Sequence, residues 1–153
     1  ENVVHVRNNI YELCDFIVNV LKTKDIGAKF PFKVGVHKSC AGLRGLRLGS
    51  SSELVEKPYS IIEDMLKEVE GVELMQIKRP DECCGFGGTF CVTEDAISVK
   101  MGKDKIKDHM DSGVEVITAT DTSCLMHLEG LINRNEQPIR VMHIAEILNS
   151  TIK

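Results

Sequence analysis

The stretch KVGVHKSC at residues 33–40 decides the fold, because a short apolar run ends there in a loop that carries a cysteine. The run at 33–37 is too short for a helix and predicts a buried strand. Further apolar runs predict strands at 72–77, 114–119 and 139–142, and the first two of these also lead into loops with cysteine. The opening stretch is therefore one unit of an element order that recurs along the chain.

Helical periodicity separates these strands. Apolar residues at steps of three and four predict helices that begin at Pro58, at Thr93 and around Asp121, and a short closing helix follows at 144–148. Strands that alternate with helices form right-handed crossovers and a parallel sheet. We therefore predict an α/β fold of the Rossmann or flavodoxin-like kind, with four parallel strands, helices on both faces and a leading helix at 7–23.

Length and charge indicate a single domain that binds no nucleic acid. The chain has 153 residues, which suits one domain over 1–153 with a βα core at about 33–150, and its start at Glu1 indicates a piece of a longer protein. With 23 acidic against 19 basic residues the formal charge is −4, which argues against binding a phosphate backbone. No apolar run approaches the ~20 residues of a transmembrane segment and no signal peptide is evident, so we expect a cytoplasmic protein.

Four of the six cysteines follow predicted strands. Cys40 comes after the first strand, Cys83 and Cys84 come after the second, and Cys124 comes after the third. Because the carboxyl ends of parallel strands meet at one edge of a sheet, we expect these thiols to converge although they are far apart in sequence. Thiolates are preferred ligands of zinc and of iron–sulfur clusters, so the sequence predicts a metal centre at this edge.

The neighbours of these cysteines somewhat favour a cluster over zinc. Gly85, Gly87 and Gly88 let backbone N–H groups approach a negatively charged, sulfur-rich centre. Arg44 either offsets the charge of a cluster, binds a carboxylate substrate or belongs to a solvated loop. His127 lies one helical turn after the last of the four cysteines, where it either ligates the metal or forms a hydrogen bond beside it.

The remaining cysteines and histidines have simpler explanations. Cys14 lies on the apolar stripe of the leading helix, and Cys91 follows the glycine-rich loop; both are predicted to be buried packing residues, with Cys91 as a reserve ligand. His37 and His143, near the predicted edge, are expected to form hydrogen bonds or to pack rather than to ligate. Surface positions are expected for His5, His109 and the charged run at 100–111.

Three segments of the chain resemble a known family. They are HKSC at 37–40, CCGFGGTF at 83–90 and CLMH at 124–127. These segments are similar to the cysteine-rich CCG domain family, and most of all to its lactate-utilisation protein A and glycolate oxidase iron–sulfur subunit branches. The resemblance extends over nearly the whole chain. Members usually carry two such domains, and this chain resembles the second, C-terminal one.

The resemblance implies an oxidoreductase component with a [4Fe–4S] cluster. It implies Cys40, Cys83, Cys84 and Cys124 as the ligands, and electron transfer in a complex that oxidises L-lactate to pyruvate, or glycolate. It also implies other subunits of the complex and a small 2-hydroxy acid as partners, and membrane association only through those subunits. The family motif ends in Cys-x-x-Cys, whereas this chain has His127 at the final position.

Two alternatives stand beside this interpretation. A zinc-stabilised module would close a tetrahedral site with Cys40, Cys83, Cys84 and either Cys124 or His127, and would hold subunits together without redox activity. A thiol–disulfide enzyme is the weaker alternative, because the adjacent cysteines at 83 and 84 lack the Cys-x-x-Cys spacing typical of redox dithiols.

Overall fold

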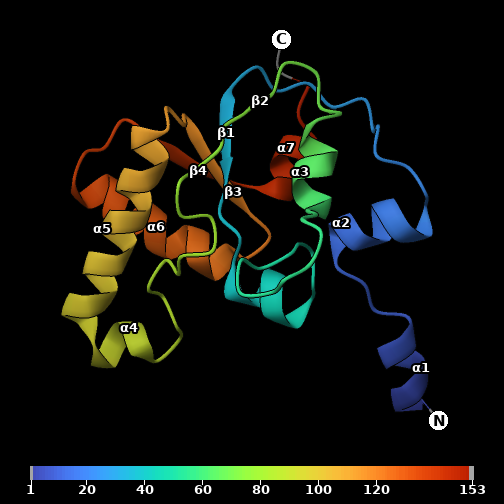
Figure 1. Cartoon of the computed structure of the whole chain (residues 1–153), viewed down its shortest axis with the longest axis horizontal. Coiled ribbons are helices and arrows are strands. Elements are labelled where there is room, and N and C mark those ends of the chain that lie inside the picture. Colours follow the sequence, from blue (N-terminus) through green and yellow to red (C-terminus); the bar gives the residue numbers. More distant parts are fainter. Residues whose placement is uncertain (1, 152–153) are drawn as a thin grey trace.

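A four-stranded parallel sheet forms the centre of the molecule (Figure 1). The computed structural model describes residues 2–151, and its strands are β1 (Lys33–Val36), β2 (Glu73–Leu74), β3 (Val116–Ala119) and β4 (Arg140–His143). Their order is β2-β1-β3-β4, every neighbouring pair is parallel, and this order matches the beginning of the flavodoxin-like arrangement. The predicted α/β class with four parallel strands is confirmed.

Helices cover both faces of the sheet, as predicted. In Figure 1, α3 and α7 lie on one side of the strands, and α5 and α6 lie on the other. Ser60 starts α3 two residues after the predicted Pro58, because its hydroxyl accepts a hydrogen bond from the N–H of Glu63. The bounds are Ile61–Leu66 for α3, Asp95–Asp111 for α5, Thr122–Arg134 for α6, Ile144–Leu148 for α7, Phe90–Thr93 for the short α4 and Ala41–Gly45 for the π-helical turn η2.

The leading helix is present but interrupted. The pieces that replace the predicted range 7–23 are α1 (Asn2–Asn8), α2 (Leu13–Asp15) and the π-helical turn η1 (Phe16–Val20). A new helix starts at α2 because the carboxylate of Glu12 accepts a hydrogen bond of 3.0 Å from the N–H of Asp15. No residue of α1 is buried, and this helix extends away from the body of the molecule (Figure 1). The predicted single helix is therefore wrong in its bounds.

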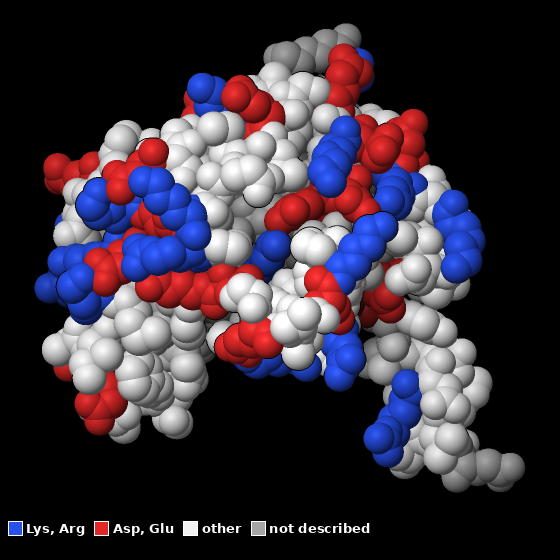
Figure 2. Space-filling view, viewed as in Figure 1, with Lys and Arg blue, Asp and Glu red and all other residues white. Residues whose placement is uncertain are grey.

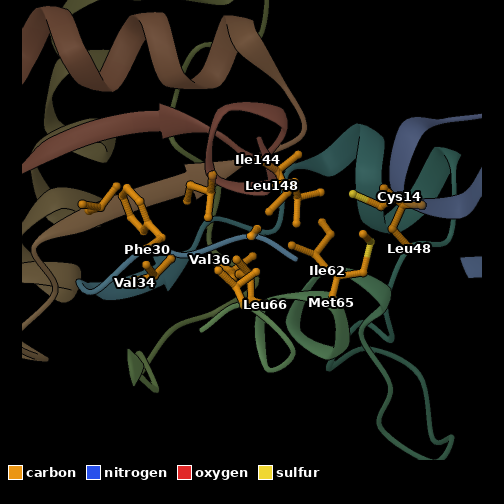
Figure 3. Close-up of a cluster of buried hydrophobic side chains, with 14 residues drawn as sticks. Cys14, Phe30, Val34, Val36, Leu48, Ile62, Met65, Leu66, Ile144 and Leu148 are labelled. Carbon is orange, nitrogen blue, oxygen red and sulfur yellow. The ribbon is translucent and has the colours of Figure 1, made fainter. Parts of the chain in front are cut away.

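Side chains of β1 and β3 point alternately to the two helical layers. Val34, Val36 and Val116 belong to a first hydrophobic cluster, which they form with residues of α3 and α7 (Figure 3). Cys14 lies fully buried in the same cluster, as the sequence predicts. Ile117 points the other way and belongs to a second cluster with residues of α5 and α6. Each helical layer is thus attached to the sheet by its own buried apolar surface.

One turn of α5 is buried although its residues are polar. Lys105 and His109 have exposed fractions of 0% and Asp108 has 4%, so the expected surface position of His109 is wrong, and the exposed face predicted for 100–111 does not include Lys105 and Asp108. The reason lies on β1, where a Cβ atom on Gly35 would be 2.8 Å from Cδ2 of His109. Only glycine at this position lets the ring of His109 approach the sheet so closely, and this contact buries His109 against β1.

The outer face of α5 carries charges, as the sequence predicts. Lys100 pairs with Asp104 and Lys107 pairs with Asp111, both across one helical turn. Figure 2 shows side chains of both signs mixed over this helix. Exposed pairs of this kind contribute at most about 1 kcal/mol each. No helix within residues 2–151 combines the length and the hydropathy needed to cross a bilayer.

Burial of His109 predicts that acid destabilises the fold. Burial lowers the pKa of His109 from 6.5 to about 4, so between these values the unfolded chain binds a proton that the folded chain does not. As the pH falls through this window, we expect the free energy of unfolding to fall by roughly 1 kcal/mol per pH unit from this residue. Urea unfolding at several pH values should give a shallower pH slope for His109→Gln, and identical slopes would contradict the prediction.

Candidate metal centre

All four cysteines that follow strands lie around one cavity at the carboxyl edge of the sheet. The cavity has a volume of about 270 Å³, and its wall includes Cys40, Cys83, Cys84, Cys124 and His37. The loops that follow β1 and β3 lead to opposite sides of the sheet, which is the position where open α/β sheets bind ligands. The structure thus brings together all four thiols that the sequence placed at this edge.

The four thiols neighbour one another in a continuous series, called the thiol series below. The thiol of Cys40 interacts with that of Cys83, Cys83 with Cys84, and Cys84 with Cys124, and all four cysteines are free. Burial increases along the series, because Cys40 is exposed, Cys83 is half-buried, and Cys84 and Cys124 are buried. The site therefore has an open end at Cys40 and a closed end at Cys124.

Hydrogen bonds and burial favour the protonated form of Cys40, Cys83 and Cys84 when no metal is bound. The hydrogen bond to Cys124 is the main reason why the pKa of Cys84 rises to about 11. The pKa of Cys83 is raised as well, first by its hydrogen bond to Cys84 and then by burial. Burial also raises the pKa of Cys40, although Arg44 acts against it. A metal that binds here has to displace thiol protons, and thiolates become its ligands.

Backbone N–H groups point at the sulfurs of Cys83 and Cys84, called the cysteine pair below. The N–H of Gly85 donates to Sγ of Cys83 at 3.3 Å, and the backbone of Phe86 is hydrogen-bonded to Cys84. Gly85 has a φ of +91°, and a Cβ atom there would be 2.6 Å from the carbonyl oxygen of Ser98 on α5. The loop needs glycine at this position for both its conformation and its contact with α5.

The other predicted cofactor-binding residues lie at the rim of the cavity. Gly87 and Gly88 form part of its wall. Arg44 follows in η2, where it is hydrogen-bonded to Cys40 and forms an ion pair of 2.5 Å with Glu53. The Arg44 side chain has an exposed fraction of 47%, so its charge lies at the open, solvent-exposed end of the thiol series.

Asp121 fixes the position of Cys124. Its carboxylate accepts hydrogen bonds from the N–H of Ser123 at 3.0 Å and from the N–H of Cys124 at 3.4 Å, which caps α6 as predicted. Cys124 therefore lies in the first turn of a thirteen-residue helix. Its side chain therefore lies at the positive end of the helix dipole, in the wall of the cavity.

His37 is the site residue whose role the sequence understated. It follows β1, has an exposed fraction of 1%, and neither ring nitrogen has a hydrogen-bond partner among the described residues. One ring nitrogen and the sulfurs of Cys84 and Cys124 all lie within 4.8 Å of one another. Burial, together with the charge of Lys105, lowers the pKa of His37 to about 3, so its imidazole is neutral and has the form that ligates metals.

The structure places His127 outside that group of three ligand atoms. His127 is half-buried on α6, its ring centroid lies 6.2 Å from that of Phe86, and its Nε2 points toward Gly102 on α5. His143 caps α7, because its Nδ1 accepts a hydrogen bond from the N–H of Ala145. Ligation by His127 therefore stays a prediction, whereas hydrogen bonding by His143 is confirmed.

Two cysteines lie away from the thiol series. Cys14 belongs to the first hydrophobic cluster, and burial raises its pKa far above the usual range of a thiol. Cys91 is half-buried on α4, and its thiol donates to the carbonyl oxygen of Gly88 at 3.0 Å. Neither forms part of the cavity wall described above.

Comparisons with known proteins show the family of this chain. Residues 34–129 match the model of the family described as "Cysteine-rich domain" (CCG), a range that includes the whole thiol series. The chain is similar to two proteins named lactate utilization protein A. The one from Bacillus velezensis is 43% identical over 140 residues, which is 92% of this chain and 55% of that protein. The one from Exiguobacterium sp. is 39% identical over 143 residues, which is 94% of this chain and 54% of that protein. The chain therefore spans a little over half the length of these relatives.

Proposed function

The chain belongs to the cysteine-rich (CCG) domain family, and from that premise we propose that it is an iron–sulfur electron-transfer module. In this proposal Cys40, Cys83, Cys84 and Cys124 bind a [4Fe–4S]-type cluster. The observation that carries the proposal is the thiol series around a single cavity, because four cysteine thiolates are the usual ligand set of such a cluster.

Residues beside the four cysteines would adjust the properties of the cluster. A bound cluster would supply one-electron redox chemistry, and the protein would set its charge and its access to water. The N–H of Gly85 at the sulfur of Cys83 would favour the more negative, reduced form. Asp121 would hold Cys124 in place, and the buried end of the thiol series would exclude water.

The names of the relatives extend the proposal to a substrate. We propose that the chain serves a system that oxidises L-lactate to pyruvate, with glycolate as the alternative substrate. This oxidation releases two electrons and two protons, whereas a cluster accepts electrons one at a time, so a partner subunit would carry out the hydroxy-acid chemistry. The chain would be the C-terminal domain of a two-domain cytoplasmic protein, bound to membranes only through other subunits.

Anaerobic reconstitution with iron and sulfide tests the cluster. We expect about four irons per chain, a broad brown absorption in the visible range and an EPR signal after reduction. The measurement is quantitative metal and sulfide analysis of the reconstituted chain together with EPR spectroscopy. Protein that takes up zinc but no iron and sulfide under these conditions would overturn the electron-transfer function.

A zinc-stabilised module is the second candidate function, and one observation favours it. The ligand atoms of His37, Cys84 and Cys124 lie within 4.8 Å of one another, and one further cysteine would complete a tetrahedral site. Such a module would join subunits without carrying electrons. Metal analysis of protein purified without air and without added iron separates the two functions, because zinc without iron and sulfide supports the module, whereas iron with sulfide supports the cluster.

Metal removal is expected to lower the melting temperature, whichever metal is native. The site joins the loops that follow β1, β2 and β3, so a metal there binds the folded chain and not the unfolded one. A ligand at 1,000 times its Kd stabilises the folded state by about 4 kcal/mol. Calorimetry of loaded and chelator-treated protein under argon measures the shift, and equal melting temperatures would contradict a metal that joins these loops.

A further inference from the structure

One turn of α5 holds the segment that leads into the cysteine pair. The carboxylate of Asp108 accepts a hydrogen bond from the N–H of Arg79 at 2.9 Å and another from the N–H of Lys78 at 3.3 Å. The two bonds use different oxygens of the same carboxylate. Asp108 therefore fixes the backbone just after β2, shortly before the cysteine pair.

Lys105 holds the same segment from its carbonyl side. Its Nζ donates to the carbonyl oxygen of Arg79 at 2.6 Å and to that of Pro80 at 3.2 Å. Together with the bonds to Asp108, four hydrogen bonds from two side chains of one helix fix residues 78–80. The cysteine pair begins only three residues further on.

The burial of Lys105 costs free energy, which indicates that its charge has a function. Its exposed fraction is 0%, and removing a charged amine from water costs several kcal/mol even after partial compensation. Attraction to Asp108, Glu82 and Asp81 offsets part of that cost. An apolar residue of similar volume would fill such a place without this cost, so the charge itself has a use beyond packing.

The charge of Lys105 lies beside the segment that leads to the cavity wall. Its Nζ is 2.6 Å from the carbonyl oxygen of Arg79, and Cys83 and Cys84, which follow this segment, line the cavity. A cation near such ligands lowers the electrostatic cost of thiolates and of a negatively charged metal–sulfur group. Lys105 therefore acts on the site through both its hydrogen bonds and its charge.

We propose that Lys105 and Asp108 are positioning residues of the metal centre, which hold the cysteine pair in ligand geometry before a metal binds. This inference rests on the proposed metal site. Without the four hydrogen bonds, the segment before the cysteine pair would sample several conformations, and metal binding would have to order it. Substitution of residues that hold metal ligands in position typically weakens metal affinity by about 10- to 100-fold.

The test compares buried and exposed positions of the same helix. Lys105→Met and Asp108→Asn remove the proposed contacts, and Lys107→Met and Asp111→Asn are matched controls from the exposed pair on the outer face of the same helix. Cobalt affinity of the full chain is measured under argon by competition with a chromophoric chelator, well below each variant's melting temperature. We expect about 10- to 100-fold weaker binding for the buried variants and unchanged binding for the controls.

A second measurement separates positioning from a purely structural role. The reduction potential of the reconstituted cluster should become more negative in Lys105→Met and stay unchanged in Lys107→Met, because a nearby cation stabilises the reduced form. If Lys105→Met does not fold, Asp108→Asn, which preserves size and shape, decides the question by cobalt affinity. A folded Asp108→Asn chain with the affinity of the unaltered protein would overturn the inference.

The two proposals fail in different ways. An unaltered chain that binds cobalt but takes up no cluster overturns electron transfer, while the cobalt comparison still tests Lys105 and Asp108. If all four variants take up a cluster and have equal cobalt affinities and equal reduction potentials, the positioning role is overturned and the electron-transfer function is not. A chain that binds neither cobalt nor a cluster overturns both.

Discussion

Replacing Cys84 with serine is expected to abolish metal binding, with iron falling from about four per chain to less than one after anaerobic reconstitution. Cys84 lies in the middle of the site. Its thiol interacts with those of Cys83 and Cys124, and its sulfur lies within 4.8 Å of a ring nitrogen of His37. A serine hydroxyl is a poor ligand for soft metals, so zinc and cobalt should be lost together with the cluster.

The chain offers two controls for this substitution. Cys14→Ser introduces the same hydroxyl at an equally buried position, since Cys14 and Cys84 have exposed fractions of 0% and 1%. Cys91→Ser makes the change next to the glycine-rich loop, where the hydroxyl can still donate to Gly88. Both controls should keep their metal. Unchanged iron content in Cys84→Ser, or equal losses in Cys14→Ser, would show that the thiol series does not bind the cluster.

The convergence of the thiols could be predicted from topology alone. Once Cys40, the cysteine pair and Cys124 were placed after three successive parallel strands, the geometry of a parallel sheet required them to meet at one edge. No local spacing was needed, because the sheet and not the loop brings them together. All four cysteines line one cavity in the structure, and metal ligation by them stays a proposal.

The role of histidines could not be predicted in the same way. His127 lies one helical turn after Cys124, and spacing alone put both on one face of α6. In the structure α5 packs close to that face at Gly102, and His127 points toward α5. His37 carried a usable signal, because a histidine directly after a buried strand is itself buried at the sheet edge, and its ring nitrogens, which have no hydrogen-bond partner among the described residues, are available to a ligand.

The buried polar turn of α5 escaped prediction because charged residues are nearly always exposed. The informative residue was Gly35 in the middle of β1, since glycine inside a strand often marks the close approach of another element. In the structure that element is the turn of α5 with Lys105 and His109.

The break in the leading helix depended on Glu12. The capping hydrogen bond of Glu12 competes with a continuous helix and leaves the apolar pattern of the sequence unchanged.

Replacing Gly85 with alanine is expected to destabilise the fold and to remove the metal at the same time. The φ of +91° costs an L-residue about 1–2 kcal/mol, and the new Cβ would meet the carbonyl oxygen of Ser98 at 2.6 Å. Overpacking against the backbone adds about 1–3 kcal/mol, so the free energy of unfolding should fall by about 3 kcal/mol. The loop can relieve this clash only by moving away from α5, which carries the cysteine pair out of place.

Gly88→Ala separates backbone strain from the clash. Gly88 also has a positive φ, +62°, but its Cβ would meet nothing within 4 Å. Its substitution should cost about 1 kcal/mol and leave metal affinity unchanged. Urea unfolding and cobalt titration of both variants measure the difference. If Gly85→Ala were no less stable than Gly88→Ala and bound cobalt as tightly, the contact between the glycine loop and α5 would not position the cysteine pair, and the loop would have to form its ligand geometry unaided.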